Sequence, residues 1–176
     1  MSPEDSTERH DRFVEAICSY FAKVTTKENR FDIVGDCIHG NAFIPHESGP
    51  IFFDILVNHT RPRNLTQLVF ECKTRIDYNT NSINSLKNEL KIFFKKSYKA
   101  IDHLKSVYRD NYQFFFISNI PFRMWNNNIT IKYIKEALRE EFNPLDEDKI
   151  SDLKQKVKII ILTEWILEFV KGEWTT

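Results

Sequence analysis

The sequence has little of what linkers, disulfide frameworks and polycationic proteins are made from. Its 176 residues include only 4 glycines, 6 prolines and 3 cysteines, and 25 basic residues balance 25 acidic ones to a formal net charge of zero. The scarcity of glycine and proline excludes a linker-rich or low-complexity chain. The zero net charge argues against a protein that coats nucleic acid through its overall charge, but it leaves room for a local basic face.

The three cysteines, Cys18, Cys37 and Cys72, are dispersed, and no C-x-x-C motif occurs. This pattern predicts neither a disulfide framework nor a zinc site. Each cysteine lies in an apolar context, so we expect reduced core residues and a cytoplasmic location. No segment approaches the ~20 apolar residues of a membrane span, and the polar, acidic N-terminus is unlike a signal peptide. We therefore expect no membrane partner.

Core-forming residues are plentiful. Hydrophobic residues make up 41% of the chain, and phenylalanine alone accounts for 15 of them. A chain of this length suits one domain with a sizeable core. We therefore predict a single domain over residues 1–176, with a core at about 8–118 and a C-terminal α-β-α extension at about 119–176.

Hydrophobic periodicity predicts an α/β fold in which helices flank a mixed central β-sheet. Apolar residues recur at helical spacing in some segments and alternate or run continuously in others. The helices are expected at 8–24, 83–109, 130–142 and 164–170, and the strands at 31–38, 51–57, 65–74, 112–118 and 157–162.

Two of these predicted strands carry charged residues where a strand interior should have none. Asp54 interrupts the apolar segment 51–57, and Glu71 and Lys73 interrupt the next one. An isolated buried charge costs many kcal/mol, so such a carboxylate must be paired, bound to metal or neutral. Glu71 and Lys73 stand two residues apart and therefore share one face of the strand. This arrangement favours the site of a divalent-metal hydrolase.

The arrangement resembles the PD-(D/E)xK nuclease superfamily, which has the restriction-endonuclease-like fold with an α-β-β-β-α-β core. Asp54 and the Glu71-Cys72-Lys73 tripeptide match the Asp and the Glu-x-Lys of that family on its second and third strands. Glu15 lies on the first predicted helix, where many members carry an acidic residue. Phe53 replaces the proline of the family name, and a Gln-x-x-x-Tyr motif of some branches is absent.

The resemblance implies a Mg²⁺-dependent endonuclease that leaves a 5′ phosphate, with double-stranded DNA as the substrate. It also implies a role as the effector of a restriction or antiviral defence system, as one domain or subunit of a larger sensor. Homo-oligomerisation is a further expectation, because cutting both strands needs two sites or sequential nicking.

The expected chemistry assigns a role to each residue. Asp54, Glu71 and the backbone carbonyl of Cys72 would hold Mg²⁺, with Mn²⁺ as a substitute, because Mg²⁺ prefers oxygen ligands. Lys73 would position or deprotonate the attacking water, and Glu15 would support Lys73 or a metal-bound water. Two carboxylates ~4 Å apart repel by ~4 kcal/mol at an effective dielectric of ~20. We therefore expect one raised carboxyl pKa in the metal-free protein.

Basic residues near this site are candidates for DNA contact. On the longest predicted helix they recur every four residues, which places them in one stripe that could follow a phosphate backbone. The full candidate set is Lys87, Lys91, Lys95 and Lys99 on the helix, Arg61 and Arg63 in the loop before the Glu71 strand, and His46 and Ser48 before the Asp54 strand. The alternative for each is a solvated helix face or loop tip.

Other readings remain open. Asp54 could be a buried aspartate that caps a turn or pairs with Lys73, and Glu71 with Lys73 could be an ion pair on an edge strand. At the level of function, the chain could be a catalytically inactive nuclease-fold module that binds nucleic acid or protein, or a ribonuclease with the same chemistry.

Overall fold

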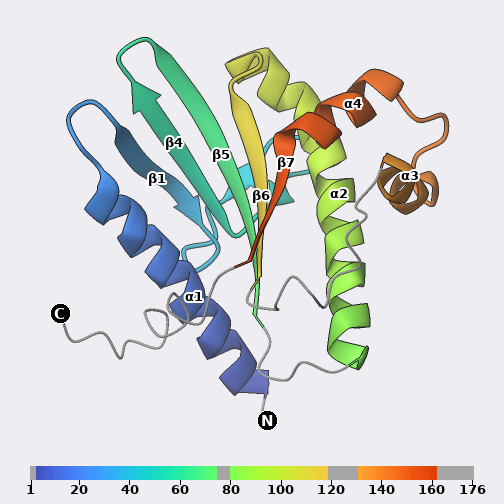
Figure 1. Cartoon of the computed structure of the whole chain (residues 1–176), viewed down its shortest axis with the longest axis horizontal. Helices are drawn as coiled ribbons and strands as arrows, with labels where there is room; N and C mark the ends of the chain where they lie inside the picture. Colours follow the sequence, from blue (N-terminus) through green and yellow to red (C-terminus); the bar gives the residue numbers. More distant parts are fainter. Residues whose placement is uncertain (1–2, 75–79, 119–130, 162–176) are drawn as a thin grey trace.

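A five-stranded mixed β-sheet in the order β1-β4-β5-β6-β7 forms the centre of the fold (Figure 1). The structure is a computed structural model that describes residues 3–74, 80–118 and 131–161. Its elements are, in chain order, α1 (Pro3–Val24), β1 (Arg30–Asp36), β2 (Phe43–Ile44), β3 (Ile51–Phe52), β4 (Ile55–Arg61), β5 (Asn64–Lys73), α2 (Thr80–Tyr108), β6 (Tyr112–Ser118), α3 (Ile131–Arg139), α4 (Glu147–Lys156) and β7 (Val157–Ile161).

Both strand directions occur in the sheet. The chain turns back on itself twice, so β1, β4 and β5 pair antiparallel, whereas β6 and β7 pair parallel to β5. The parallel steps need crossover connections, which α2 and the α3–α4 segment provide. The predicted α/β class with a mixed sheet is confirmed.

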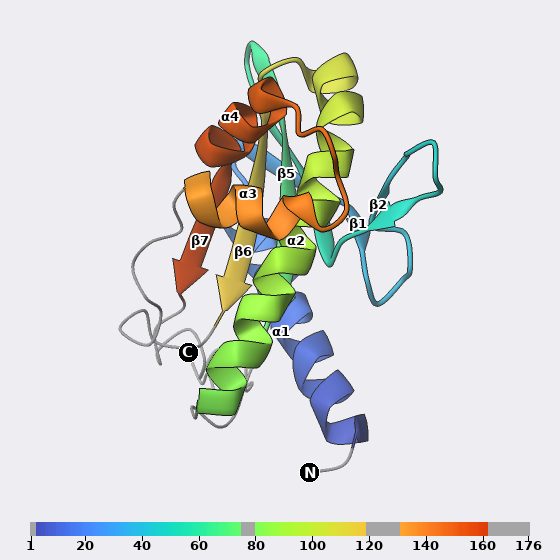
Figure 2. The same ribbon diagram turned by 90° about the vertical axis from the view of Figure 1, so that its right-hand side faces the viewer.

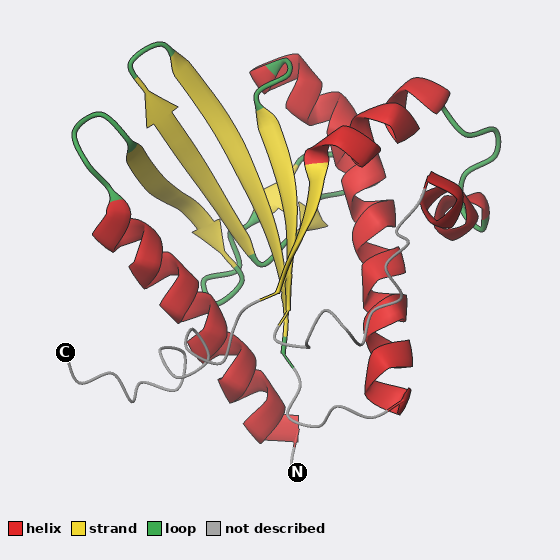
Figure 3. Ribbon diagram, viewed as in Figure 1, coloured by secondary structure: helices red, strands yellow, loops and turns green. Residues whose placement is uncertain are grey.

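Helices cover both faces of the sheet (Figures 1 and 3). α1 lies on one face, where Phe13, Val14 and Ile17 pack in a cluster that includes Ile55 and Phe70. α2, α3 and α4 lie on the other face, and Figure 2 shows them in front of the strands. Because both faces are covered, the central strands contain continuous buried apolar runs, Ile55–Val57 in β4 and Leu68–Phe70 in β5.

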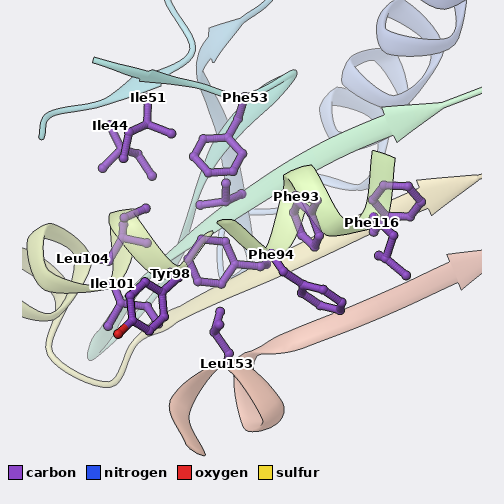
Figure 4. Close-up of a cluster of buried hydrophobic side chains, with 14 of the residues drawn as sticks. Ile44, Ile51, Phe53, Phe93, Phe94, Tyr98, Ile101, Leu104, Phe116 and Leu153 are labelled. Atoms are coloured by element: carbon purple, nitrogen blue, oxygen red, sulfur yellow. The ribbon is translucent and has the colours of Figure 1, made fainter. Parts of the chain in front are cut away.

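The larger core cluster lies between α2 and the sheet. Phe93 and Phe94 of α2 are fully buried, and Phe93 contacts the rings of Phe114 and Phe116 on β6. Figure 4 shows Phe93, Phe94 and Phe116 with Leu153 of α4, which belongs to the same cluster. The interlocked rings hold α2 in a defined rotation against the sheet, and this rotation decides which of its charged residues face the strands.

The structure differs from the prediction in two places. Helix α4 was not predicted, because only Ile150 and Leu153 are buried along its length. The predicted strand 51–57 is divided into β3 and β4, and β3 pairs with β2 in a separate small hairpin. The predicted helix 164–170 lies outside the described residues. Within the part of the chain that the structure describes, no helix is long and apolar enough to cross a bilayer.

Candidate active site

Asp54 occupies the break between β3 and β4. The Phe53 N–H donates to the carbonyl of Ala42, next to β2, whereas the following N–H, that of Asp54, donates to the carbonyl of Phe70 on β5. The chain thus changes partner within one residue. Asp54 is therefore at a bend that opens the strand, and not in the interior of a continuous strand as its sequence context indicates.

The Asp54 carboxylate supplies the hydrogen-bond acceptor that β5 lacks at this break. Its Oδ2 accepts a hydrogen bond from the Cys72 N–H at 2.6 Å. The bend takes the chain away from β5 at this point, and a buried N–H needs a partner. Asp54 is only 9% exposed, so this contact also fixes the carboxylate beside the end of β5. The Asp54 side chain therefore has a structural role, because it accepts a hydrogen bond from a strand N–H and not from a turn.

Glu71 lies on the α2 face of β5 and has two lysine partners. Its Oε1 is 3.3 Å from Nζ of Lys73, and its Oε2 accepts a hydrogen bond from Nζ of Lys96 at 2.7 Å. Lys73 also approaches Oε2 of Glu89 at 3.3 Å. Glu71 is 5% exposed, whereas the side chains of Lys73 and Lys96 retain 20% and 24% exposure. The structure brings Asp54, Glu71 and Lys73 to the same end of two adjacent strands.

The two carboxylates differ in their affinity for protons. Burial and the nearby charge of Asp54 raise the pKa of Glu71, although Lys96 and Lys73 act against the rise. Burial would also raise the pKa of Asp54, but the hydrogen bond and charge of His10, together with the Cys72 N–H and the charge of Lys73, lower that pKa. Two acidic groups with pKa values shifted in opposite directions are a common feature of catalytic sites. One raised carboxyl pKa is what the sequence led us to expect.

Lys73 remains strongly basic in this environment. Burial alone would lower its pKa, but the charges of Glu71, Asp54 and Glu89 raise it above the ordinary value for lysine. In the structure as described, Lys73 is therefore an ammonium group. This state suits it to orient a water molecule or to stabilise negative charge on a phosphate.

Three residues that the sequence did not single out complete the site. Glu89 and Lys96 are seven residues apart on α2 and share the face that packs on the sheet with Phe93. His10 on α1 lies with its Nε2 3.4 Å from Oδ1 of Asp54. Hydrogen bonds to Asp54 and Cys37 raise the pKa of His10 to about 10. No local spacing marks these residues as part of the site, because they come from α1 and α2, far in sequence from Asp54 and Glu71.

Glu15 lies elsewhere. Its side chain is exposed on α1, whereas His10, from the same helix, faces Asp54. The helix turns by about 100° per residue, so positions 10 and 15 cannot both face the sheet edge. The structure therefore gives no support to the predicted role of Glu15 beside Lys73.

The lysine stripe on α2 faces α3 and the segment that follows it. Lys95 pairs with Glu140 at 3.1 Å and Lys99 with Glu141 at 2.6 Å. Lys91 contributes to the field that lowers the pKa of Glu140, and the Lys87 carbonyl accepts from the Tyr133 hydroxyl. Lys96, one residue beyond the stripe, is rotated by about 100° and reaches Glu71 instead. Lys95 and Lys99 are therefore held in ion pairs with the segment that follows α3, and the predicted DNA contact of these lysines stays a prediction.

The remaining predicted DNA contacts lie on two hairpins. Arg61 pairs with Asn64 at the tip of the β4–β5 hairpin, at the opposite end of β4 from Asp54. Seven residues of strand separate Arg61 from Asp54, which is about 23 Å at ~3.3 Å per residue. The prediction that Arg61 and Arg63 lie beside the site is therefore wrong. His46 and Ser48 bond to each other at 2.7 Å in the turn between β2 and β3.

Comparisons with models of protein families, with curated proteins and with solved structures found no match. The resemblance to the PD-(D/E)xK superfamily therefore depends on the residues and geometry described above.

Proposed function

We propose that this domain is a metal-dependent nuclease that hydrolyses phosphodiester bonds in double-stranded DNA. One observation supports the proposal most directly. Two buried carboxylates, Asp54 and Glu71, lie close enough for Asp54 to raise the pKa of Glu71, and Lys73 lies 3.3 Å from Glu71. A purely structural core has no need for such a concentration of charge, because apolar residues would fill the same volume at lower cost.

The donor atoms at the site fit a hard divalent cation. Asp54 and Glu71 supply carboxylate oxygens from adjacent strands, and the Cys72 carbonyl belongs to the same segment of β5. Added positive charge would also relieve the repulsion that raises the pKa of Glu71. We therefore assign these three groups as the residues that would hold Mg²⁺ or Mn²⁺. Such an ion, when bound, polarises the phosphate and lowers the pKa of a water molecule.

The neighbouring side chains have separate tasks in this mechanism. The ammonium of Lys73 orients the attacking water and offsets the negative charge that develops on the phosphate. Lys96 neutralises Glu71 at 2.7 Å and so keeps this carboxylate in place. Glu89 holds Lys73 from the side of α2. The restriction-endonuclease-like fold and the defence role stay predictions that follow from the resemblance.

A plasmid-cleavage assay tests the proposal. We expect wild-type protein to nick or linearise supercoiled DNA with Mg²⁺ or Mn²⁺ and not with EDTA. Lys73→Ala and Glu71→Gln should lower the rate by about 100-fold or more, since positioned acid–base groups contribute factors of this size. Lys135→Ala is the matched control, because Lys135 pairs with Glu147 on α4. Undiminished cleavage by both site variants would refute the assignment.

A second function is favoured by the contacts of Asp54. Its hydrogen bond to the Cys72 N–H serves the fold, and an inactive nuclease-fold module would retain it. This alternative predicts DNA binding without cleavage under every metal condition of the same assay. A parallel reaction on structured RNA separates the ribonuclease alternative, which predicts faster cleavage of RNA than of plasmid.

A further inference from the structure

Three side chains with different donor atoms meet on the α1 side of Asp54. His10 comes from α1, Cys37 directly follows β1, and Asp54 directly precedes β4. One nitrogen, one sulfur and one carboxylate oxygen from these residues all lie within 4.8 Å of one another. The backbone fixes two of them, because the Cys37 N–H donates to the Asp54 carbonyl at 2.8 Å. The cluster therefore follows from how α1, β1 and β4 meet.

We propose that His10, Cys37 and Asp54 form a binding site for a borderline divalent ion such as Zn²⁺. An imidazole nitrogen, a thiolate and a carboxylate are the ligands that zinc takes in proteins, whereas Mg²⁺ takes oxygen. The site leaves a fourth position of the tetrahedron for water, as in zinc sites with three protein ligands.

The spacing of the ligand atoms is compatible with this ion. Nitrogen and oxygen ligands at ~2.0–2.1 Å from a tetrahedral zinc ion are about 3.4 Å apart. Nε2 of His10 is 3.4 Å from Oδ1 of Asp54. The sulfur of half-buried Cys37 lies within 4.8 Å of a ring nitrogen of His10 and a carboxylate oxygen of Asp54. His10 retains 26% side-chain exposure, which leaves a path for the ion to enter.

This site adjoins the carboxylate–lysine cluster of the proposed nuclease and shares Asp54 with it. Glu71 has its lysine partners on the α2 face, whereas His10 approaches Asp54 from the α1 side. Asp54 is the shared residue: its Oδ1 faces His10 and its Oδ2 accepts from the Cys72 N–H. A bound ion would tie α1 to the ends of two strands and fix the position of Asp54. The inference goes beyond the proposed function and does not depend on it.

Cobalt spectroscopy of the full chain tests the inference. We expect chelator-treated wild-type protein to develop a thiolate-to-cobalt charge-transfer absorption on titration with Co²⁺. Zn²⁺ should remove the absorption at one ion per chain, and excess Mg²⁺ should not. Cys37→Ser should abolish it, whereas Cys18→Ser should retain it, because Cys18 is half-buried in the same hydrophobic cluster but is not part of the ligand group. No absorption in the wild type, or an unchanged absorption in Cys37→Ser, would overturn the proposal.

Three further measurements keep the test independent of folding and of nuclease activity. Zn²⁺ at about 100 times its Kd should raise the wild-type Tm by about 5–10 °C and leave that of Cys37→Ser unchanged. His10→Gln should keep a thiolate absorption but raise the Kd at least about tenfold. Glu71→Gln should lose cleavage and keep the cobalt absorption. A wild type that cleaves DNA but shows neither the absorption nor the Tm shift would refute the zinc site alone.

Discussion

The pair formed by Lys96 and Glu71 allows a quantitative test of the site. At 2.7 Å and an effective dielectric of ~20, the two charges attract by about 6 kcal/mol before desolvation is counted. Removal of one partner from a buried pair typically costs 3–5 kcal/mol. Here Lys73 remains 3.3 Å from Glu71, and the Lys96 side chain is 24% exposed, so the loss is smaller. We expect Lys96→Met to lower the free energy of unfolding by about 2–3 kcal/mol at neutral pH.

Methionine keeps an unbranched apolar side chain on Phe53, above which the Lys96 ammonium lies at 4.8 Å from the ring centroid. The lost cation–π contact is the same whether position 71 is Glu or Gln, so it cancels in a double-mutant cycle. In a Glu71→Gln background, Lys96→Met should therefore cost less than about 1 kcal/mol, which leaves a coupling energy of about 2 kcal/mol.

The loss of stability caused by Lys96→Met should also depend on pH. Burial and Asp54 raise the pKa of Glu71 above its ordinary 4.5, so on acidification the folded chain takes up this proton before the unfolded chain does. Neutral Glu71 no longer needs an ammonium partner. The cost of Lys96→Met is therefore present above the folded pKa of Glu71 and is lost as the pH falls through it.

Urea denaturation of the four proteins of the cycle, in chelator, measures these quantities. A coupling energy below about 0.5 kcal/mol would show that Lys96 does not stabilise the Glu71 carboxylate, and would refute the role given to it above. A cost of Lys96→Met that stays constant from neutral pH to below pH ~4.5 would refute the assignment of the effect to the charge of Glu71.

Three further variants test the surrounding fold by denaturation. Tyr112→Phe should stabilise the protein by about 1 kcal/mol, because the buried Tyr112 hydroxyl has no hydrogen-bond partner among the described residues. Burial raises the pKa of Tyr112, so wild-type stability should also fall as the pH rises through the ordinary value of 10.0, and the variant should lack this contribution. Asp146→Ala should cost about 1 kcal/mol, since the Asp146 carboxylate accepts from the Asp148 and Lys149 N–H groups at the start of α4; equal stability would count against the cap. Gly35→Ala should cost about 2 kcal/mol or more, because the new Cβ would lie 2.4 Å from the Asn41 carbonyl oxygen; a neutral result would mean that β1 shifts freely.

Long periodic segments of the sequence predicted their structures well. The apolar run around Phe70 became the central strand β5, and the helical spacing from Leu86 to Leu104 became α2. The short elements were harder to predict from the sequence. Asp146 is a typical N-cap, yet α4 buries only two residues and therefore has a weak periodic signal. The division of residues 51–57 has no signal in composition, because it arises when Phe53 bonds to Ala42 instead of to β5.

The residues of the candidate site likewise fall into those that the sequence identified and those that it did not. Asp54, Glu71 and Lys73 were identifiable because a charged residue within an apolar strand is energetically costly in any fold. The sequence by itself therefore determined the fold class and these three positions. Only the tertiary structure decided their partners: the rotation of α2 brings Lys96 to Glu71 and directs Lys95 to Glu140, and the docking of α1 brings His10 to Asp54. Periodicity specifies which residues share a helix face, whereas the packing of one element on another specifies what that face meets.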